Sequence, residues 1–271
     1  MDVIESHGAR IPILGFGTMT LKEDVCVQLV EAVLRLGYRH LDTAQMYGNE
    51  REVGSGVRGS GLKREDIFLT TKVWFTRLAA GDFERSVDER LERLALPWVD
   101  LLMIHWPNAQ VPLSESVASL CKMKKAGLAK HIGVANFNVA MIEEAVKLAS
   151  EPIAVLQIET HPYLDQTKVI AAARRHGMAV VGYCPLARGK VPTDPTLQRI
   201  GKAYGKTLAA LRFLEQQQII PIPRTSKRER LAENLGSLDF TLSGAEMAEI
   251  AKLKRPDSWI VSPPQAPKWD T

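Results

Sequence analysis

Four polar residues of types that transfer protons or bind polar ligands recur along the sequence at nearly equal intervals. Asp42, Lys72, His105 and Asn136 are separated by 30, 33 and 31 residues, and each ends a short apolar run. A lysine in such a position is rarely buried without a partner, and the carboxylate of the preceding run supplies an opposite charge. The near-constant spacing predicts one polar side chain per repeated unit, all directed toward one site.

Each of these residues also has a purely structural explanation. His105 alone could be a core histidine with satisfied hydrogen bonds, and the lysine and aspartate could form an ion pair that only supports the fold. The same pattern continues, however, because Gln157 and Glu159 lie in the sixth apolar run and Tyr183 ends the seventh. We therefore interpret the polar run ends as one active site.

Short β-branched apolar runs alternate with longer amphipathic stretches, which predicts strands alternating with helices. Within 25–34, 83–94 and 141–149, apolar residues recur every three or four positions, as in a helix with one buried face. Eight such units predict a (β/α)8 TIM barrel with its active site at the carboxyl ends of the strands. An open doubly wound sheet is the alternative. The predicted strands are Ile11–Gly17, Tyr38–Asp42, Ile67–Lys72, Val99–His105, His131–Asn136, Ile153–Glu159, Ala179–Tyr183 and Ile219–Ile222.

Other sequence signals predict a hairpin, two helix starts and the extent of the domain. Asp2–Arg10, with His7 and a glycine near its centre, predicts a small N-terminal β-hairpin before the first barrel strand. Capping boxes of the form Ser-x-x-Glu at Ser226 and Ser243 predict the starts of two late helices. No linker or low-complexity segment is evident, so we expect a single barrel domain over residues 1–271.

The composition argues against several classes of function. The net charge of +4, from 35 basic and 31 acidic residues, is too even for a nucleic-acid-binding face. Three cysteines without CxxC spacing argue against a disulfide framework and a zinc cluster, and they indicate a reducing compartment. The N-terminus lacks the apolar core of a signal peptide, and no apolar run approaches the roughly 18 residues of a membrane span. We expect a cytoplasmic protein with no nucleic-acid or membrane partner.

Two motifs suggest other chemistry, but their context does not support it. Residues 54–59 match GxGxxG, yet a dinucleotide fingerprint follows a strand and opens a helix, whereas a charged helical segment precedes these glycines and a turn follows them. We interpret them as small residues near a helix end. His40 and Asp42 form an HxD motif, as in a metal-dependent barrel hydrolase, but no second metal-spaced histidine pair is evident. We expect no metal.

Several segments resemble, in the same order, the aldo-keto reductase family. The resemblance runs from about residue 10 to about residue 240, and the short length and the ending Ala266–Asp270 are most similar to bacterial 2,5-diketo-D-gluconate reductases. The matching segments are Gly37–Ala44 with Tyr47–Glu50, Leu102–Pro107, Ile132–Phe137, Ile222–Ser226 and Glu229–Asn234.

The resemblance implies an NADPH-dependent enzyme whose cofactor lies extended across the barrel mouth. It implies a catalytic tetrad of Asp42, Tyr47, Lys72 and His105. The implied cofactor-binding residues are Thr18, Asp42, Asn136, Gln157, Tyr183, Pro185, Leu186, Arg188, Arg224, Thr225, Ser226, Arg230, Glu233 and Asn234, and the implied substrate-binding residues are Met19, Trp74, His105 and Trp106. Of these, Asn136 and Gln157 would hold the carboxamide and Tyr183 would stack on the nicotinamide. Ala135 stands where the family usually has serine, and Met19 stands near a usual aromatic position.

The tetrad suggests how each residue would act. Carbonyl reduction needs a hydride from the cofactor and a proton from the protein. A free tyrosine has a pKa of about 10, and a positive charge beside it favours the phenolate. We expect Lys72 to lower the pKa of Tyr47, Asp42 to keep Lys72 charged, and His105 to donate a hydrogen bond to the carbonyl oxygen.

The loops after the seventh and eighth strands of such barrels commonly bind phosphate. Arg188 lies in the first loop, and Arg224 and Arg230 lie in and after the second, beside a predicted helix start. Because the planar fork of arginine bonds two phosphate oxygens at once, we expect a preference for NADPH over NADH. Lys227 and Arg228 are interpreted as solvated surface charges.

The expected function is the reduction of aldehydes and ketones to alcohols by a monomer. Small dicarbonyls, aromatic aldehydes and keto-sugar acids such as 2,5-diketo-D-gluconate are the expected substrates. The alternative is an NADPH-binding regulatory or redox-sensing subunit with little turnover, since the family includes NADPH-binding channel partners. The complete tetrad favours an enzyme.

Overall fold

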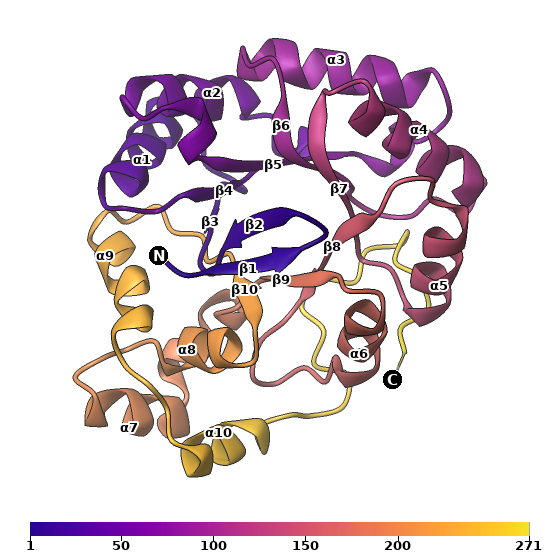
Figure 1. Cartoon of the computed structure of the whole chain (residues 1–271). Helices are drawn as coiled ribbons and strands as arrows, with labels where there is room; N and C mark the ends of the chain where they lie inside the picture. The colour runs from indigo at the N-terminus through magenta and orange to yellow at the C-terminus, as the bar shows by residue number, and fades with distance from the viewer. Residues whose placement is uncertain (271) are drawn as a thin grey trace.

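The computed structural model describes residues 1–270, and within them eight parallel strands form the wall of a barrel (Figure 1). Neighbours in sequence are neighbours in the sheet, which runs from β3 to β10 without a change of order. The strands are β3 (Phe16–Gly17), β4 (His40–Asp42), β5 (Phe68–Val73), β6 (Val99–Ile104), β7 (Ala129–Ala135), β8 (Ile153–Glu159), β9 (Ala179–Tyr183) and β10 (Ile219–Pro221). Backbone hydrogen bonds close the barrel between its first and last strands, from Gly15 N–H to Pro221 O at 3.0 Å and from Gly17 N–H to Pro223 O at 3.1 Å. The predicted (β/α)8 barrel is confirmed, and the open sheet is wrong.

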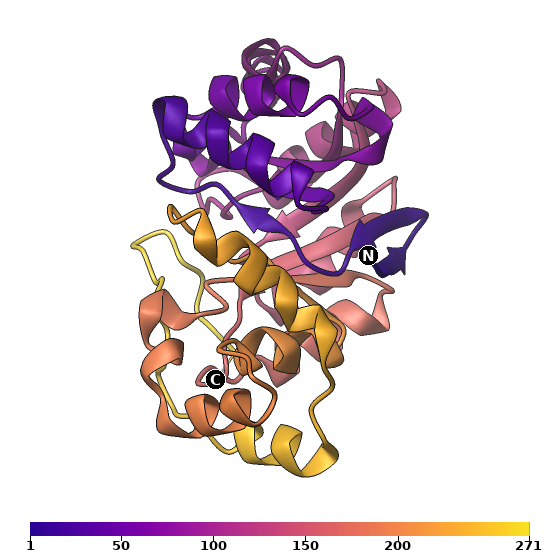
Figure 2. The same cartoon turned by 90° about the vertical axis from the view of Figure 1, so that its left-hand side faces the viewer.

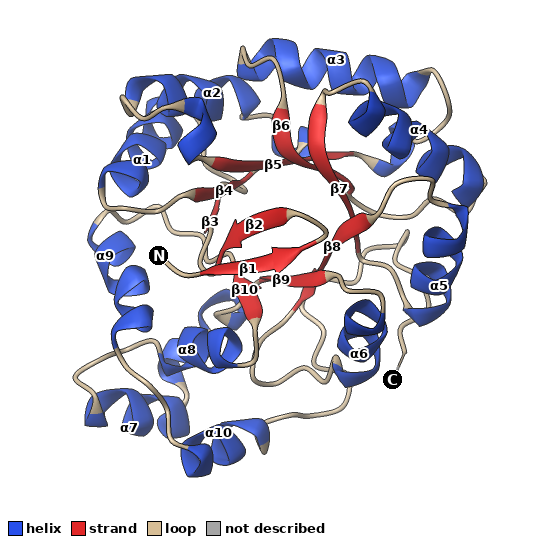
Figure 3. Cartoon of the chain, viewed as in Figure 1, coloured by secondary structure: helices blue, strands red, loops and turns tan. Residues whose placement is uncertain are grey.

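Helices surround the strands and cover the outer face of the barrel (Figure 3). Those between the strands turn an apolar stripe inward, as in α1, where Cys26, Leu29, Val30 and Val33 are buried. The helices are α1 (Glu23–Arg35), α2 (Glu50–Gly59), α3 (Asp82–Leu94), α4 (Leu113–Lys125), α5 (Val139–Leu148), α6 (Thr167–Arg175), α7 (Pro195–Ala203), α8 (Ala209–Gln216), α9 (Glu229–Leu235) and α10 (Gly244–Ala251). Among the described residues, no helix combines the length and apolar character that crossing a membrane requires.

The N-terminal hairpin covers one end of the barrel, and the prediction of a single strand over Ile11–Gly17 is wrong. Strands β1 (Val3–Ser6) and β2 (Ala9–Pro12) pair antiparallel, so Ile11 belongs to the hairpin and only Phe16 and Gly17 belong to the barrel. Ile11 packs into the barrel interior beside Phe68 and Leu101, which is why the apolar run looked continuous. Figure 2 shows the hairpin at the end of the barrel opposite the C-terminal tail.

The other seven predicted strands lie within two residues of the observed bounds, but the two capping boxes differ in outcome. Ser243 caps α10 as predicted, because its hydroxyl accepts the Glu246 N–H at 3.3 Å and the Glu246 carboxylate accepts the Ser243 N–H at 2.7 Å. The Ser226 box is wrong. Helix α9 begins only at Glu229, and the residue before it offers no side-chain cap. Thr225 instead accepts the Lys227 N–H at 3.0 Å, which forms a local turn in place of the first helical turn.

The glycines of the GxGxxG match allow helices to pack closely. They lie inside α2, where a Cβ on Gly54 would stand 2.0 Å from Leu94 O of the α3 terminus. A Cβ on Gly56 would stand 2.6 Å from the Val30 Cβ of α1. The motif therefore joins three helices on the outside of the barrel.

This packing predicts that Gly54→Ala destabilises the fold. Alanine is favoured over glycine in a helix by about 1 kcal/mol. The added carbon nevertheless meets a backbone oxygen that cannot move alone, so we expect the free energy of unfolding in urea to fall by about 1–3 kcal/mol. Gly244→Ala in α10 is the matched control, because no described residue beyond its chain neighbours and its own helix backbone lies within 4 Å of its Cβ position. Equal stability of the two variants would contradict this explanation.

Candidate active site

A buried ion pair joins β4 and β5 at the carboxyl end of the barrel. Lys72 Nζ lies 2.6 Å from Asp42 Oδ1 and donates a second hydrogen bond to Thr43 O at 3.0 Å. The other carboxylate oxygen of Asp42 accepts from Gln157 Nε2 of β8 at 2.8 Å. Both charged side chains are at most 1% exposed, so their charges act on the site with little screening by water.

Tyr47 lies over this pair on a short 3-10 turn, η1 (Gln45–Tyr47), that follows β4. Lys72 Nζ is 5.3 Å from the centre of the Tyr47 ring. Burial raises the pKa of Tyr47 well above its usual value, and the Asp42 carboxylate raises it further. Desolvation is the largest cause, so the net shift of this pKa is upward, and the expected contribution of Lys72 in the opposite direction stays a prediction. The phenol therefore keeps its proton at neutral pH.

His105 follows β6 and completes a compact aromatic group. Its ring centre lies 5.8 Å from that of Tyr47 and 5.1 Å from that of Trp74, both edge-to-face. Burial lowers the pKa of His105 well below its usual value, and the Lys72 charge lowers it further. The imidazole is therefore neutral and carries one N–H. Its Nδ1 is buried without a hydrogen-bond partner among the described residues.

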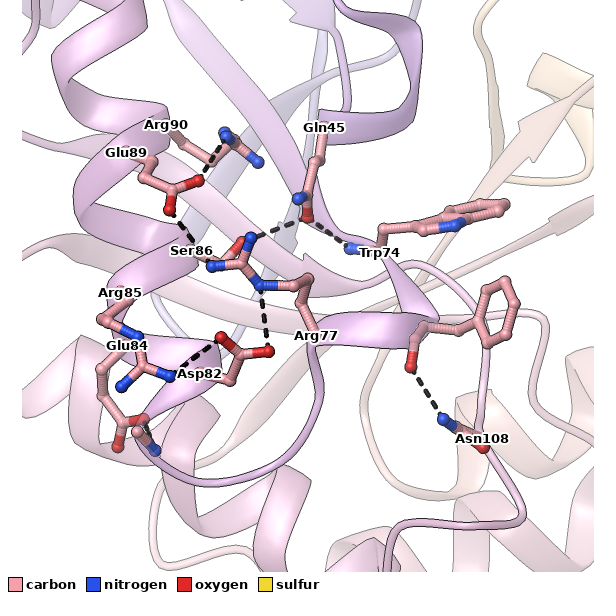
Figure 4. A network of polar contacts seen from close by, with 12 residues as sticks. Gln45, Trp74, Arg77, Asp82, Glu84, Arg85, Ser86, Glu89, Arg90 and Asn108 are labelled. Atoms are coloured by element: carbon pink, nitrogen blue, oxygen red, sulfur yellow. Dashed lines mark hydrogen bonds and ion pairs between the residues drawn. The ribbon is translucent and has the colours of Figure 1, made fainter.

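The turn that carries Tyr47 is fixed by a residue that the sequence did not single out. The side-chain amide oxygen of Gln45 accepts a hydrogen bond from the backbone N–H of Trp74 at 2.9 Å and another from the Ser86 hydroxyl at 3.1 Å. Figure 4 shows this amide between the loop after β5 and helix α3, with Arg77 holding the same loop through ion pairs to Asp82 and Glu89. Gln45 thus fixes the position of Tyr47 relative to Trp74.

A second polar group lies where β7, β8 and β9 end. The Tyr183 hydroxyl donates to Asn136 Oδ1 at 2.7 Å, and Asn136 Nδ2 donates to His105 O at 2.9 Å. Asn136 adopts a left-handed backbone conformation, with φ of 61°, which turns its amide toward the mouth. Gln157 donates to Asp42, as described above. Together, these hydrogen bonds bring the residues expected to hold a carboxamide next to the tetrad residues. Ala135 is buried in the barrel interior.

The residues expected to contact phosphates and adenosine are mostly exposed on the loop after β10 and on α9. Arg224 Nε donates to Met19 O at 3.0 Å, which brings this loop beside the loop after β3. Arg230 is exposed and forms no side-chain hydrogen bond or ion pair with another described residue.

The other residues expected to bind the cofactor differ in exposure. Ser226 and Glu233 are exposed, whereas Thr225 and Asn234 are buried. Thr18 is also buried, and its hydroxyl donates to Asp42 O at 3.0 Å. After β9, Pro185 is buried, Leu186 is half-buried and Arg188 is exposed.

The three expected pocket walls differ in exposure. Met19 and Trp74 are half-buried, whereas Trp106 is only 4% exposed because Trp269 of the C-terminal tail lies against it, with ring centres 6.1 Å apart. No group of three or more metal-binding side chains occurs within residues 1–270, and His40 packs edge-to-face on Phe68.

Comparison with known proteins agrees with this geometry. Residues 13–255 match the sequence profile of the Aldo/keto reductase family. The chain belongs to the aldo/keto reductase family. It is 38% identical to the methylglyoxal reductase DkgB of Escherichia coli O157:H7, over 96% of this chain and 99% of that one.

Solved structures of related reductases have the same fold. A crystal structure assigned as a 2,5-diketo-D-gluconic acid reductase B superposes with a TM-score of 0.98 at 47% identity, covering 100% of this chain and 98% of the other. The Bombyx mori aldo-keto reductase in complex with NADP gives a TM-score of 0.86 at 32% identity, with 93% and 92% covered. The expected family and carbonyl-reducing class are confirmed.

The buried ion pair predicts strong energetic coupling between Asp42 and Lys72 in this aldo/keto reductase. Asp42→Asn leaves a buried ammonium group without its counter-charge, so we expect the free energy of unfolding in urea to fall by about 3–5 kcal/mol. Adding Lys72→Met removes the remaining charge and should recover much of that loss. Asp239→Asn, in an exposed pair with Lys206, is the control and should change stability by less than about 1 kcal/mol. Purely additive losses at residues 42 and 72 would argue against the coupling.

Proposed function

We propose that this aldo/keto reductase uses NADPH to reduce aldehydes and ketones to alcohols, with Tyr47 as the general acid. The observation that carries the proposal is the buried Asp42–Lys72 pair directly beside the Tyr47 and His105 rings. This set provides one proton donor, one neutral N–H donor and one fixed cation around the place where a carbonyl oxygen would gain negative charge.

Each member of the set has a distinct part in moving the proton. Tyr47 is protonated at neutral pH because its pKa is raised, so a proton is available for the carbonyl oxygen. After the transfer, Lys72, 5.3 Å from the ring centre, stabilises the phenolate that remains. Asp42 holds Lys72 in place. His105 is neutral and directs its N–H at the same oxygen, so it orients the substrate without competing as an acid.

The donor groups at the mouth fit a nicotinamide dinucleotide. The cofactor supplies the hydride, which leaves the protein to bind, orient and protonate. Asn136 and Gln157 offer amide groups suited to a carboxamide, and the Tyr183 hydroxyl is bonded to Asn136 beside them. Further residues proposed to bind the cofactor are Thr18, Asp42, Pro185, Leu186, Arg188, Arg224, Thr225, Ser226, Arg230, Glu233 and Asn234.

The proposed substrates are small dicarbonyls and keto-sugar acids. Relatives named for methylglyoxal and for 2,5-diketo-D-gluconic acid support this class. Met19, Trp74 and Trp106 are the proposed walls, with His105 at the reacting oxygen. We further propose that the enzyme acts as a cytoplasmic monomer.

Tyr47→Phe tests the acid directly. The variant keeps the ring and loses only the hydroxyl, so we expect kcat to fall by about 10²- to 10⁴-fold with the NADPH dissociation constant unchanged. Single-turnover NADPH oxidation with methylglyoxal would separate the chemical step from binding. Near wild-type turnover would show that another group is the acid. NADPH binding by a wild type without turnover would favour the regulatory subunit.

Arg230→Ala tests the cofactor preference. Charge-assisted bonds to a phosphate contribute about 1.5–3 kcal/mol, so we expect NADPH to bind roughly 10- to 150-fold more weakly and NADH to bind almost unchanged. Arg230 is a cleaner test than Arg224, whose guanidinium also donates to Met19 O.

Arg228→Ala is the matched control for this prediction, because Arg228 is an exposed arginine two residues away. It should leave both dissociation constants unchanged at moderate salt. If Arg230→Ala lost equal affinity for NADPH and for NADH, this arginine would not bind the phosphate on the adenosine ribose.

A further inference from the structure

A buried carboxylate outside the proposed tetrad holds the C-terminal tail against the barrel. Glu159 ends β8 and is fully buried, two residues beyond Gln157. Its Oε1 accepts the Ile260 N–H at 2.8 Å, and its Oε2 accepts the Val261 N–H at 2.8 Å. His161 Nε2 lies 2.9 Å from Oε1 and donates to it. A side chain at the mouth of the barrel is thus bonded to two consecutive amides about 100 residues later in the chain.

The residues next to these amides lead by contact to the reacting group. Trp259 precedes the first anchored amide and stacks on Trp269, with ring centres 4.0 Å apart and planes 14° apart. Trp269 lies edge-to-face against Trp106, whose neighbour in the chain is His105. The tail crosses the end of the barrel that lies opposite the hairpin (Figure 2). The position of the indole pair beside Trp106 therefore depends on where the tail is held.

The far end of the tail is also fixed to the barrel. The Asp270 carboxylate accepts the Val139 N–H of α5 at 2.7 Å, and Asn138 Nδ2 donates to Lys268 O at 3.1 Å. These residues follow Asn136, which belongs to the proposed carboxamide site. The tail is thus held at one end by the last residue of β8 and at the other by the start of α5, and the tryptophan stack joins its two ends.

The chemistry of the contact explains why residue 159 is a glutamate. Two N–H groups from consecutive residues need two acceptors side by side, which a carboxylate provides and an amide does not. A glutamine here would place an NH2 group against one backbone N–H, so one buried donor would lose its partner.

We propose that Glu159 is a positioning residue that fixes the C-terminal tail, and through Trp259 and Trp269 the wall of the carbonyl-substrate pocket next to Trp106. The inference rests on the proposed reductase function and extends it to the side of the pocket formed by the tail. Glu159 does not contact the reacting atoms. We expect it to act on substrate binding through the tail.

Glu159→Gln in the full-length protein tests the proposal with two independent measurements. Hydrogen exchange at the Ile260 and Val261 amides should speed up by about tenfold or more, as expected for the loss of a charge-assisted hydrogen bond. Steady-state kinetics with methylglyoxal should show KM raised about tenfold and kcat within about twofold, since the tail contributes equally to the bound substrate and the transition state. The NADPH dissociation constant should not change. Glu144→Gln, at an exposed position on α5, is the matched control.

Asp270→Ala keeps the test decisive if the buried variant does not fold, because Asp270 is only half-buried and releases the other end of the tail. It should raise KM in the same way. Faster exchange with unchanged KM would overturn the positioning role while leaving the reductase function intact. Losses of kcat and of NADPH affinity of equal size would also overturn it, because they would show that the substitution damages the whole site. A wild type with no carbonyl reduction would instead refute the proposed function, and the inference with it.

Discussion

The arrangement of the proposed site depends on one buried ion pair, Asp42 with Lys72. Removing two charges from water costs several kcal/mol per ion, and only close contact with further hydrogen bonds offsets that cost. Here the contact is 2.6 Å, Thr43 O accepts a second hydrogen bond from Lys72, and Gln157 Nε2 donates to the other oxygen of Asp42. The pair joins the neighbouring strands β4 and β5, Thr43 follows β4, and Gln157 of β8 reaches Asp42 because the sheet closes into a barrel. The same closure that stabilises the fold therefore brings Gln157 to the Asp42 carboxylate.

This pair also adds to the pKa shifts that burial causes at the neighbouring groups. Burial is the largest cause at both groups: it raises the pKa of the Tyr47 phenol, with Asp42 adding to the shift, and it lowers the pKa of the His105 imidazole, with Lys72 adding to the shift. Both groups are consequently neutral at physiological pH. In the proposed reaction Tyr47 then donates its proton, and His105 a hydrogen bond, to the carbonyl oxygen of the substrate. Lys72 stabilises the phenolate that remains. The two ends of the barrel differ in kind: the hairpin end is closed by apolar packing, whereas loops and the tail form the other end.

Much of this could be predicted from the sequence because it follows from periodicity. Alternating apolar runs and amphipathic stretches indicated the barrel, and the regular spacing of polar run ends placed Asp42 beside Lys72. Features that depend on contacts across the fold could not be predicted in this way. The run Ile11–Gly17 is uniformly apolar, although its first residues belong to β2 and its last two to β3. At the Ser226 capping box, a local turn at Thr225 forms in place of the predicted helix start. Gln45 and Glu159 act through partners 29 and 101 residues away, and nothing local in the sequence identifies those partners.

The central claim, that this barrel transfers a hydride from a bound nicotinamide to a carbonyl carbon while the protein supplies the proton, is tested most directly by isotope tracing. The wild-type enzyme is given NADPH that carries deuterium at its hydride position, together with methylglyoxal, in ordinary water. The account predicts that the product alcohol contains one deuterium on the carbon of the former carbonyl group, and that NADPH is consumed in equal amount. A product without deuterium on that carbon, or no product while NADPH remains bound, would contradict it.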